Sequence, residues 1–298
     1  EKLKQHNDAV DAHRQALRIN PEYAEAWNGI GIAYLGLERY YEAIDAHHEA
    51  LRINPEYAEA WNNIGFNYFS LKLYKEAVDA YHRALRIDYE YTGAWYNLGV
   101  AYGCLEEYND AIDSYRQAIR VNPGHADAWY SLGTVYGGFN LNKEAIEAYR
   151  QALQINPDHP EAWYCLGVAY IGLKLDKDAV DAFLQALRVN PGHADAWHNL
   201  GVAYGNLGEY EDAVEAYRGA LRINPDHADA WFSLGVTYDN LELTQEAIEA
   251  YRQALRINPG DADALYNLGI DYTISGNRNA ALNALRDLRL LDQPLADK

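Results

Sequence analysis

The stretch "DAWYSLGTVYGGFNLNKEAIEAYRQALQINP", residues 127–157, carries a tryptophan, Trp129, that has a counterpart 34 residues away on either side. A fixed interval of this length decides the fold, because stacked repeats and a single globular core are built differently. The interval holds along almost the whole chain. The residues in register are Trp27, Trp61, Trp95, Trp129, Trp163, Trp197 and Trp231, followed by Leu265.

Other residues keep the same step, so the whole unit repeats and not the tryptophan alone. A glycine follows four residues later: Gly31, Gly65, Gly99, Gly133, Gly167, Gly201, Gly235 and Gly269. A tyrosine follows three residues after that: Tyr34, Tyr68, Tyr102, Tyr136, Tyr170, Tyr204, Tyr238 and Tyr272. An alanine recurs in the second half: Ala43, Ala77, Ala111, Ala145, Ala179, Ala213, Ala247 and Ala281.

Each unit is predicted to form two helices. Apolar residues recur at three- and four-residue steps in residues 126–139 and again in 142–156, which is the period of a helix with one buried face. A turn around Asn140 separates the two helices, and Pro157 cannot continue the second. Gly133 and Ala145 allow the two helix axes to approach. One such pair cannot bury its apolar face, whereas stacked copies can.

The pattern W-x-x-L-G-x-x-Y, then Ala, an aromatic, Ala and Pro at a 34-residue spacing, resembles the tetratricopeptide repeat family. The resemblance implies an all-α, right-handed superhelical solenoid of stacked antiparallel helix pairs, with a concave groove lined by the first helix of each pair. We expect a single array over residues 1–298. It comprises the second helix of a partial repeat in 1–23, seven full repeats in 24–261, and a terminal repeat with a tail in 262–298.

Three repeats depart from the pattern. In the first repeat, His47 stands where an aromatic residue usually packs. In the second, Tyr89 replaces the closing proline and Gly93 replaces an acidic residue. In the eighth, Leu265 replaces tryptophan and Leu288 replaces alanine, as expected of an end repeat.

Candidate binding residues lie where packing leaves the first helix free. If each tryptophan is position 4, positions 2, 5, 6, 9, 12 and 13 share one helix face, and the resemblance places that face in the groove. The candidates at position 5 are Asn62, Tyr96, Tyr130, Tyr164, His198, Phe232 and Tyr266; at position 6, Asn63, Asn97, Asn199 and Asn267; at position 9, Val100, Thr134, Val168, Val202 and Val236.

Two kinds of interaction are expected at these residues. Burial of the aromatic and apolar side chains would drive binding, and the asparagine amides, which donate and accept hydrogen bonds, would hold a peptide backbone. Two alternatives stay open. The position 5 tyrosines also belong to the common pattern of the family, and asparagine is also tolerated as an exposed helix residue.

The charge limits the class of partner. The chain has 25 basic and 44 acidic residues, a net charge of −19, which disfavours nucleic acid and anionic membranes and permits a neutral or basic partner. No apolar run is long enough to cross a bilayer. Position 2 is acidic in seven repeats, which either complements the helix dipole or rims the groove. Lysine and arginine are absent from position 5, so the carboxylate clamp known in this family is not expected.

Catalysis, metal binding and cofactor binding are not expected. The histidines His125, His159, His193 and His227 recur in the loops, each in a different repeat and with no second ligand at a suitable spacing. Cys104 and Cys165 are isolated thiols. The sequence has no glycine-rich phosphate loop, no nucleophile elbow and no HExxH motif.

The sequence therefore predicts a non-catalytic scaffold or adaptor that binds a peptide segment, neutral to basic with apolar anchors, of a partner protein. Two alternatives remain open. Similar arrays precede the catalytic domain of O-GlcNAc transferases, so the chain could be the recognition arm of a larger enzyme. Weak end-to-end self-association is the second, because the helix with Val10 and Leu17 and the last helix, with Leu282, Leu285 and Leu288, lack neighbouring repeats. No compartment is identified.

Overall fold

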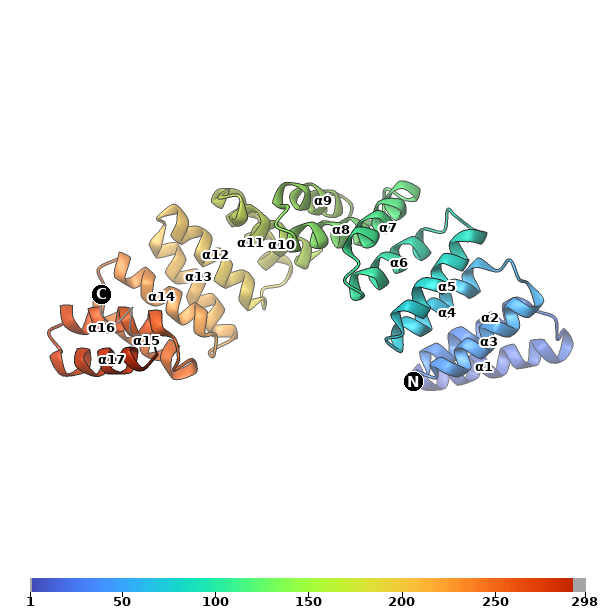
Figure 1. Ribbon diagram of the computed structural model, residues 1–298, viewed down its shortest axis with the longest axis horizontal. Coiled ribbons are helices and arrows are strands. Elements are labelled where there is room, and N and C mark those ends of the chain that lie inside the picture. The colour runs from blue at the N-terminus through green and yellow to red at the C-terminus, as the bar shows by residue number, and fades with distance from the viewer. Residues whose placement is uncertain (1, 292–298) are drawn as a thin grey trace. The chain divides into compact units, whose positions relative to one another are not determined.

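A computed structural model describes residues 2–291 of the chain, and its described part consists of seventeen α-helices without a strand (Figure 1). Helix α1 is Lys2–Ile19. The first helices of the repeats are α2 (Ala24–Gly36), α4 (Ala58–Ser70), α6 (Thr92–Cys104), α8 (Ala126–Gly138), α10 (Pro160–Gly172), α12 (Ala194–Leu207), α14 (Ala228–Asn240) and α16 (Ala262–Ile274). The second helices are α3 (Tyr40–Ile53), α5 (Tyr74–Ile87), α7 (Tyr108–Val121), α9 (Asn142–Ile155), α11 (Asp176–Val189), α13 (Tyr210–Ile223), α15 (Thr244–Ile257) and α17 (Arg278–Leu291).

The helices fall into two compact units, residues 1–139 and residues 140–298. Helices α1–α8 form the N-terminal unit, and α9–α17 form the C-terminal unit. Inside each unit, every helix packs against the one before and the one after it, and successive first helices, such as α4 and α6 or α10 and α12, also touch. The predicted all-α fold of stacked helix pairs is confirmed. A single array over residues 1–298 stays a prediction.

The glycine at position 8 is explained by the ring that the second helix inserts against it. A Cβ atom built on Gly65 would lie 2.6 Å from Cε1 of Tyr81, and one on Gly167 would lie 2.6 Å from Cε1 of Phe183. Real Cβ atoms do not come so close, so only glycine leaves room for the ring. The alanines of the second helices, such as Ala77, are fully buried. The close approach of the two helices predicted from the sequence is therefore confirmed.

Each first helix ends in a turn that reverses the chain through a left-handed residue. After α2, the N–H of Arg39 donates to the carbonyl of Tyr34 at 2.9 Å, and the N–H of Glu38 donates to Leu35 at 2.9 Å. These two bonds form a Schellman motif, whose left-handed residue is usually glycine. Here most are not glycine. The residues with positive φ are Glu38, Lys72, Glu106, Asn140, Lys174 and Glu242, together with Gly208 and Gly276.

From Trp95 to Trp231, the recurring tryptophan ties the first helix to the loop before it. The indole N–H of Trp129 donates to the carbonyl of Pro123 at 3.1 Å, and that of Trp95 donates to Tyr89 at 2.8 Å. Tyr89, which replaces the usual proline, also stacks edge-on against Trp95, with ring centroids 5.2 Å apart, and donates to Gln117 at 3.1 Å. The junction without a proline therefore keeps the bond and gains a ring contact.

Candidate functional site

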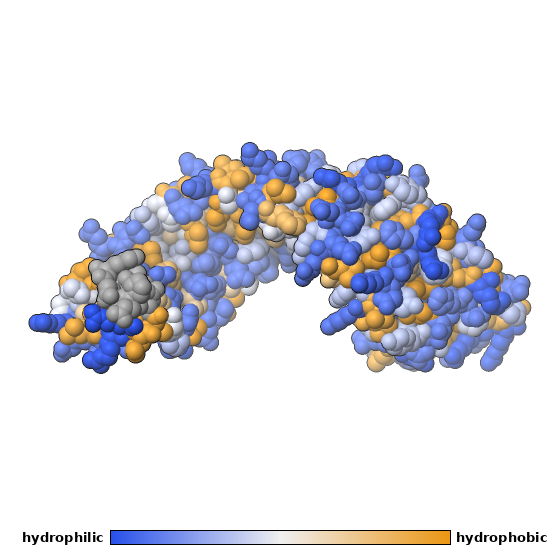
Figure 2. Space-filling model, viewed as in Figure 1, coloured by the Kyte–Doolittle hydropathy of each residue, from blue (hydrophilic) through white to orange (hydrophobic). Residues whose placement is uncertain are grey.

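The position 9 side chains lie on the surface of the first helices, as the sequence predicts. The exposed fraction is 42% for Phe66, 43% for Val168 and 42% for Ile270. Thr134 is exposed too, and the others are half-buried: Val100, Val202 and Val236. Figure 2 shows apolar residues interspersed among polar ones on the face in view. A row of apolar side chains at position 9 thus stays in contact with solvent in each unit.

The position 5 rings are half-buried, and three of them, Tyr96, Tyr164 and His198, each contact two other rings. In the C-terminal unit, the ring centroid of Tyr164 lies 6.0 Å from that of Phe183 and 4.7 Å from that of His193. Burial, followed by the charge of Asp195, raises the pKa of Tyr164. One edge of each ring therefore stays accessible while its faces are used inside the unit. The half-buried members are Tyr96, Tyr130, Tyr164, His198, Phe232 and Tyr266.

Asn62 differs from the other predicted site residues, because it is buried, with 8% of its surface exposed. Its Oδ1 accepts a hydrogen bond from Nδ2 of Asn97 at 3.1 Å. Little of this side chain is therefore left for a ligand.

The position 6 asparagines link each repeat to the one before it. Asn63 donates to Oδ1 of Asn28 at 3.1 Å, and Asn199 donates to the hydroxyl of Tyr164 at 3.1 Å. Asn267 donates to the hydroxyl of Tyr251 at 3.3 Å. Each amide thus uses one of its two N–H groups inside its unit. The prediction that these amides hold a peptide backbone now rests on the other N–H and on Oδ1.

The loop histidines cap the first helices. Nδ1 of His125 accepts the N–H of Ala128 at 3.2 Å, and His159, His193 and His227 make the same bond. The ring of His125 also stacks on Tyr96, with centroids 4.9 Å apart. Among the described residues, no group of three His, Cys, Asp or Glu side chains could hold a metal ion. Capping and stacking therefore account for the recurrence.

A pair of acids, one buried and one half-buried, was missed in the sequence. Asp239 on α14 and Asp271 on α16 line a cavity of about 440 Å³ on the first-helix face. The hydroxyl of Tyr251 donates to Oδ2 of Asp239 at 2.6 Å. A signal existed in the aligned repeats, since Asp239 is the only acid at position 12 and Asp271 the only acid at position 10.

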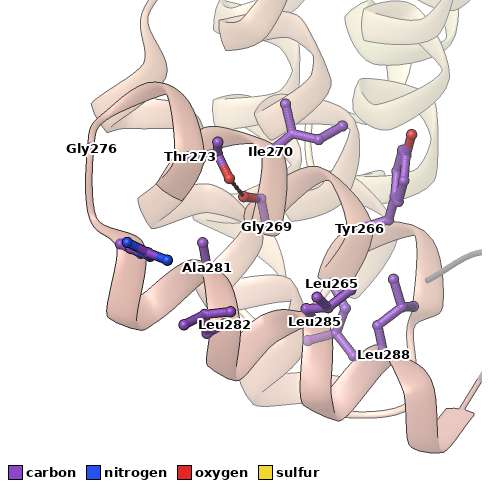
Figure 3. A pocket seen from close by; sticks show the side chains of 11 residues that line it. Leu265, Tyr266, Gly269, Ile270, Thr273, Gly276, Ala281, Leu282, Leu285 and Leu288 are labelled. Atoms are coloured by element: carbon purple, nitrogen blue, oxygen red, sulfur yellow. Dashed lines mark hydrogen bonds between the residues drawn. The ribbon is translucent and has the colours of Figure 1, made fainter. Parts of the chain in front are cut away.

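A second cavity, of about 590 Å³, lies on the last helix pair (Figure 3). It is lined by apolar side chains of both helices, among them Leu282, Leu285 and Leu288 on α17 and Ile270 on α16. At the other end, the prediction that the side of Val10 lacks cover is wrong. Val10 is 5% exposed and packs with Ile30 of α2, because α1 already lies against that helix.

Two family models match the chain. Residues 24–57, 58–88 and 93–125 match the tetratricopeptide repeat model, and residues 126–295 match the model of the cilia and flagella-associated protein 70 C-terminal domain, a domain of such repeats. The chain belongs to the tetratricopeptide repeat family. This confirms the resemblance found in the sequence.

Solved structures of tetratricopeptide repeat proteins resemble the chain. YrrB, described as having an unusual peptide-binding site, is 30% identical, with a TM-score of 0.58 over 63% of this chain and 96% of YrrB. MamA is 28% identical, with a TM-score of 0.54 over 56% of this chain and 97% of MamA. A protein from Cytophaga hutchinsonii, 16% identical with a TM-score of 0.67 over 80% of this chain and 98% of its own, shares the fold.

The comparison with curated proteins gives no match. Among the described helices, none is both long and apolar enough to cross a membrane.

Proposed function

We propose that this tetratricopeptide repeat scaffold binds an extended or helical peptide segment of a partner protein on the first-helix face. The family is one of protein-interaction scaffolds, typically without catalysis. The proposed site comprises the position 5, 6 and 9 residues named above. Each unit offers such a face, and we propose that residues 1–298 form one array of repeats.

The row of apolar position 9 side chains carries this proposal. Val168 and Ile270 are exposed, and Thr134 occupies the same position in α8, whereas Val202 and Val236 are half-buried and also pack against the core of their unit. Exposed valine and isoleucine side chains arranged in a row favour burial against a ligand. The half-buried rings beside them, such as Tyr164, suit the role of anchors, because aromatic residues dominate binding energy at interfaces.

The net charge of −19 and the acids at position 2, such as Asp195 and Asp229, support a neutral or basic partner. YrrB, with its peptide-binding site, supports the peptide class of ligand by similarity. The recognition arm of a larger enzyme, as in O-GlcNAc transferases, remains the alternative use of the same face. No observation in the structure favours it.

Peptide selection tests the proposal. Random peptides displayed on phage are selected on the immobilised chain, and the affinity of a selected peptide is measured by calorimetry. Changing Val168, Val202 and Val236 together to threonine should weaken binding by about 2 kcal/mol, because the shape is kept while apolar contact is lost. The control changes Val121 and Val189, on the second helices, to threonine. Equal affinity for both variants would exclude the position 9 row.

Self-association is a second candidate function, favoured by the apolar cavity on α16 and α17 (Figure 3). In earlier repeats, the corresponding surface of the second helix is covered by the next first helix. A second copy of the chain would supply such a helix in a head-to-tail contact. Sedimentation at rising concentration and salt should show dimers, and Leu282→Glu should abolish them. A monomer throughout would contradict this candidate.

A further inference from the structure

Asp271, which is buried, and Asp239, which is half-buried, form an acidic pair in the C-terminal unit. Asp271 is only 3% exposed, and its Oδ2 has no hydrogen-bond partner. Asp239 accepts from the hydroxyl of Tyr251 at 2.6 Å, and that hydroxyl accepts from Asn267 at 3.3 Å. The hydroxyl of Tyr251 thus serves Asp239, while Oδ2 of Asp271 is left without a partner.

Asp271 borders a cavity, although its Oδ2 is itself buried. The two acids line a space of about 440 Å³ together with Asn267, Ile270 and Ile274. Glu242, in the turn between α14 and α15, and Thr244, the first residue of α15, line it as well. Isoleucine side chains along the walls and acids at the base suit an aliphatic chain that carries a cationic group.

Packing of the helix pairs does not require these acids. At position 10, where α16 has Asp271, α12 has Ala203; at position 12, where α14 has Asp239, α12 has Gly205. Helix α12 packs against its neighbours without them. Burying a carboxylate without a charged partner costs free energy. Among the described residues, no Lys, Arg or His forms an ion pair with either acid.

The two acids oppose each other's ionisation. Burial, followed by the charge of Asp239 and hydrogen bonding to it, raises the pKa of Asp271 to about 7. Burial also raises the pKa of Asp239, although its hydrogen bonds with Tyr251 and Asp271 act in the opposite direction. A cation bound in the cavity would reduce this repulsion, because its charge offsets those of the two acids. A guanidinium group has a planar fork of N–H donors that matches carboxylate oxygens.

We propose that this cavity binds the guanidinium group of an arginine side chain of the partner peptide. The inference rests on the proposed function and specifies one residue of the ligand. A metal ion is the poorer occupant, because the described residues contain no group of three suitable ligands here.

The probe for the test is N-acetyl-arginine methylamide, and its control is the citrulline analogue, which has nearly the same shape and no charge. Titration of the full chain at pH 8 is followed by the NMR signals of the backbone amides of residues 239 and 271. The arginine probe should shift them in a saturable way and bind at least about tenfold more tightly than the citrulline probe, a difference of about 1.4 kcal/mol.

Two variants locate the site. Asp271→Ala and Asp239→Gly copy residues that α12 already carries at these positions, and each should weaken arginine binding at least tenfold. Asp271→Asn, which keeps the shape, serves if the alanine variant does not fold. Affinity should also rise from pH 6 to pH 8, as Asp271 loses its proton. Asp239, Glu242 and Tyr251 are the other titratable groups that face it.

Equal binding of the two probes, or an unchanged affinity in both variants, would overturn the proposal. The same signals shifting with calcium chloride at lower concentration than with arginine would also overturn it, in favour of a metal site. The threonine variant keeps Ile270, the position 9 residue that lines this cavity, so it should bind the probe normally. A chain that does not bind the arginine probe could therefore still bind peptides on the first-helix face. A chain that binds the probe could likewise fail to bind peptides on that face.

Discussion

Replacing His47 by phenylalanine should stabilise the N-terminal unit. His47 is fully buried on α3, and neither of its ring nitrogens has a hydrogen-bond partner. It lies against Gly31 as Phe183 lies against Gly167 in the C-terminal unit, so the position accepts a phenylalanine ring. A buried polar group without a partner costs about 1–3 kcal/mol. We expect a gain of about 2 kcal/mol at pH 7.

The gain should be larger in acid. Burial, with a smaller contribution from the charge of His48, lowers the pKa of His47 to about 4, from 6.5. Between these two values the unfolded chain binds a proton that the folded chain does not, so the folded state loses stability as the pH falls. At pH 5 the loss is about 2 kcal/mol, which phenylalanine removes. At pH 5 the free energy of unfolding of the variant should therefore exceed that of the natural protein by about 4 kcal/mol.

Native-state hydrogen exchange of α2 and α3, followed by mass spectrometry at pH 7 and pH 5, measures these differences locally. The measurement is preferable to a single melting curve, because repeat arrays need not unfold in one step. His48→Phe, at the neighbouring exposed histidine, is the matched control and should change the exchange little at either pH. A phenylalanine variant less stable than the natural protein, or a gap that does not grow at pH 5, would refute the reasoning.

Three further predictions concern single positions. Gly99→Ala should destabilise α6 by about 2 kcal/mol, because the new Cβ would lie 2.6 Å from the ring of Tyr115. Gly103→Ala should stabilise α6 by up to about 1 kcal/mol, because no atom lies within 4 Å of the new Cβ. Urea unfolding measures both changes. Glu106→Gly should stabilise by about 1 kcal/mol, since Glu106 has a φ of 62°, and a melting temperature that falls would contradict this. Asp271→Asn should make the free energy of unfolding of the C-terminal unit less dependent on pH. The raised pKa of Asp271 makes the folded state lose stability as the pH rises from about 4 to about 7. Urea unfolding at pH 5 and pH 8 measures the difference.

The sequence was sufficient for the parts of the fold that depend on spacing. The tryptophan interval predicted the helix pairs, the turn at Asn140 and the apolar face with Val168, because these follow from periodicity inside one repeat. The asparagine at position 6 was harder. Whether Asn199 meets solvent or the hydroxyl of Tyr164 depends on the distance between successive first helices, which the spacing of residues does not give.

The acidic pair was missed for a related reason. Asp239 and Asp271 occupy different positions of two successive repeats, so neither stands out beside the other in the chain. The histidine caps were missed because histidine is not among the usual N-cap residues. Val10 was misjudged because a helix without a first helix of its own was assumed to lie open, although α2 covers that side.

The asparagine bonds between repeats bear on how the number of repeats can change. Asn97 bonds Asn62, and Asn63 bonds Asn28 in the same way one repeat earlier. Deleting residues 58–91 would bring Asn97 opposite Asn28 and restore the same amide pair. Duplication or loss of gene sequence in this region can therefore lengthen or shorten the chain by a whole repeat while the amide hydrogen bonds between repeats are kept. At Tyr164 the bonded pair is Asn199 and a tyrosine hydroxyl instead of two asparagines. Gain or loss of a repeat there would therefore bring together residues that do not form the same bond, and a second substitution would be needed to restore it.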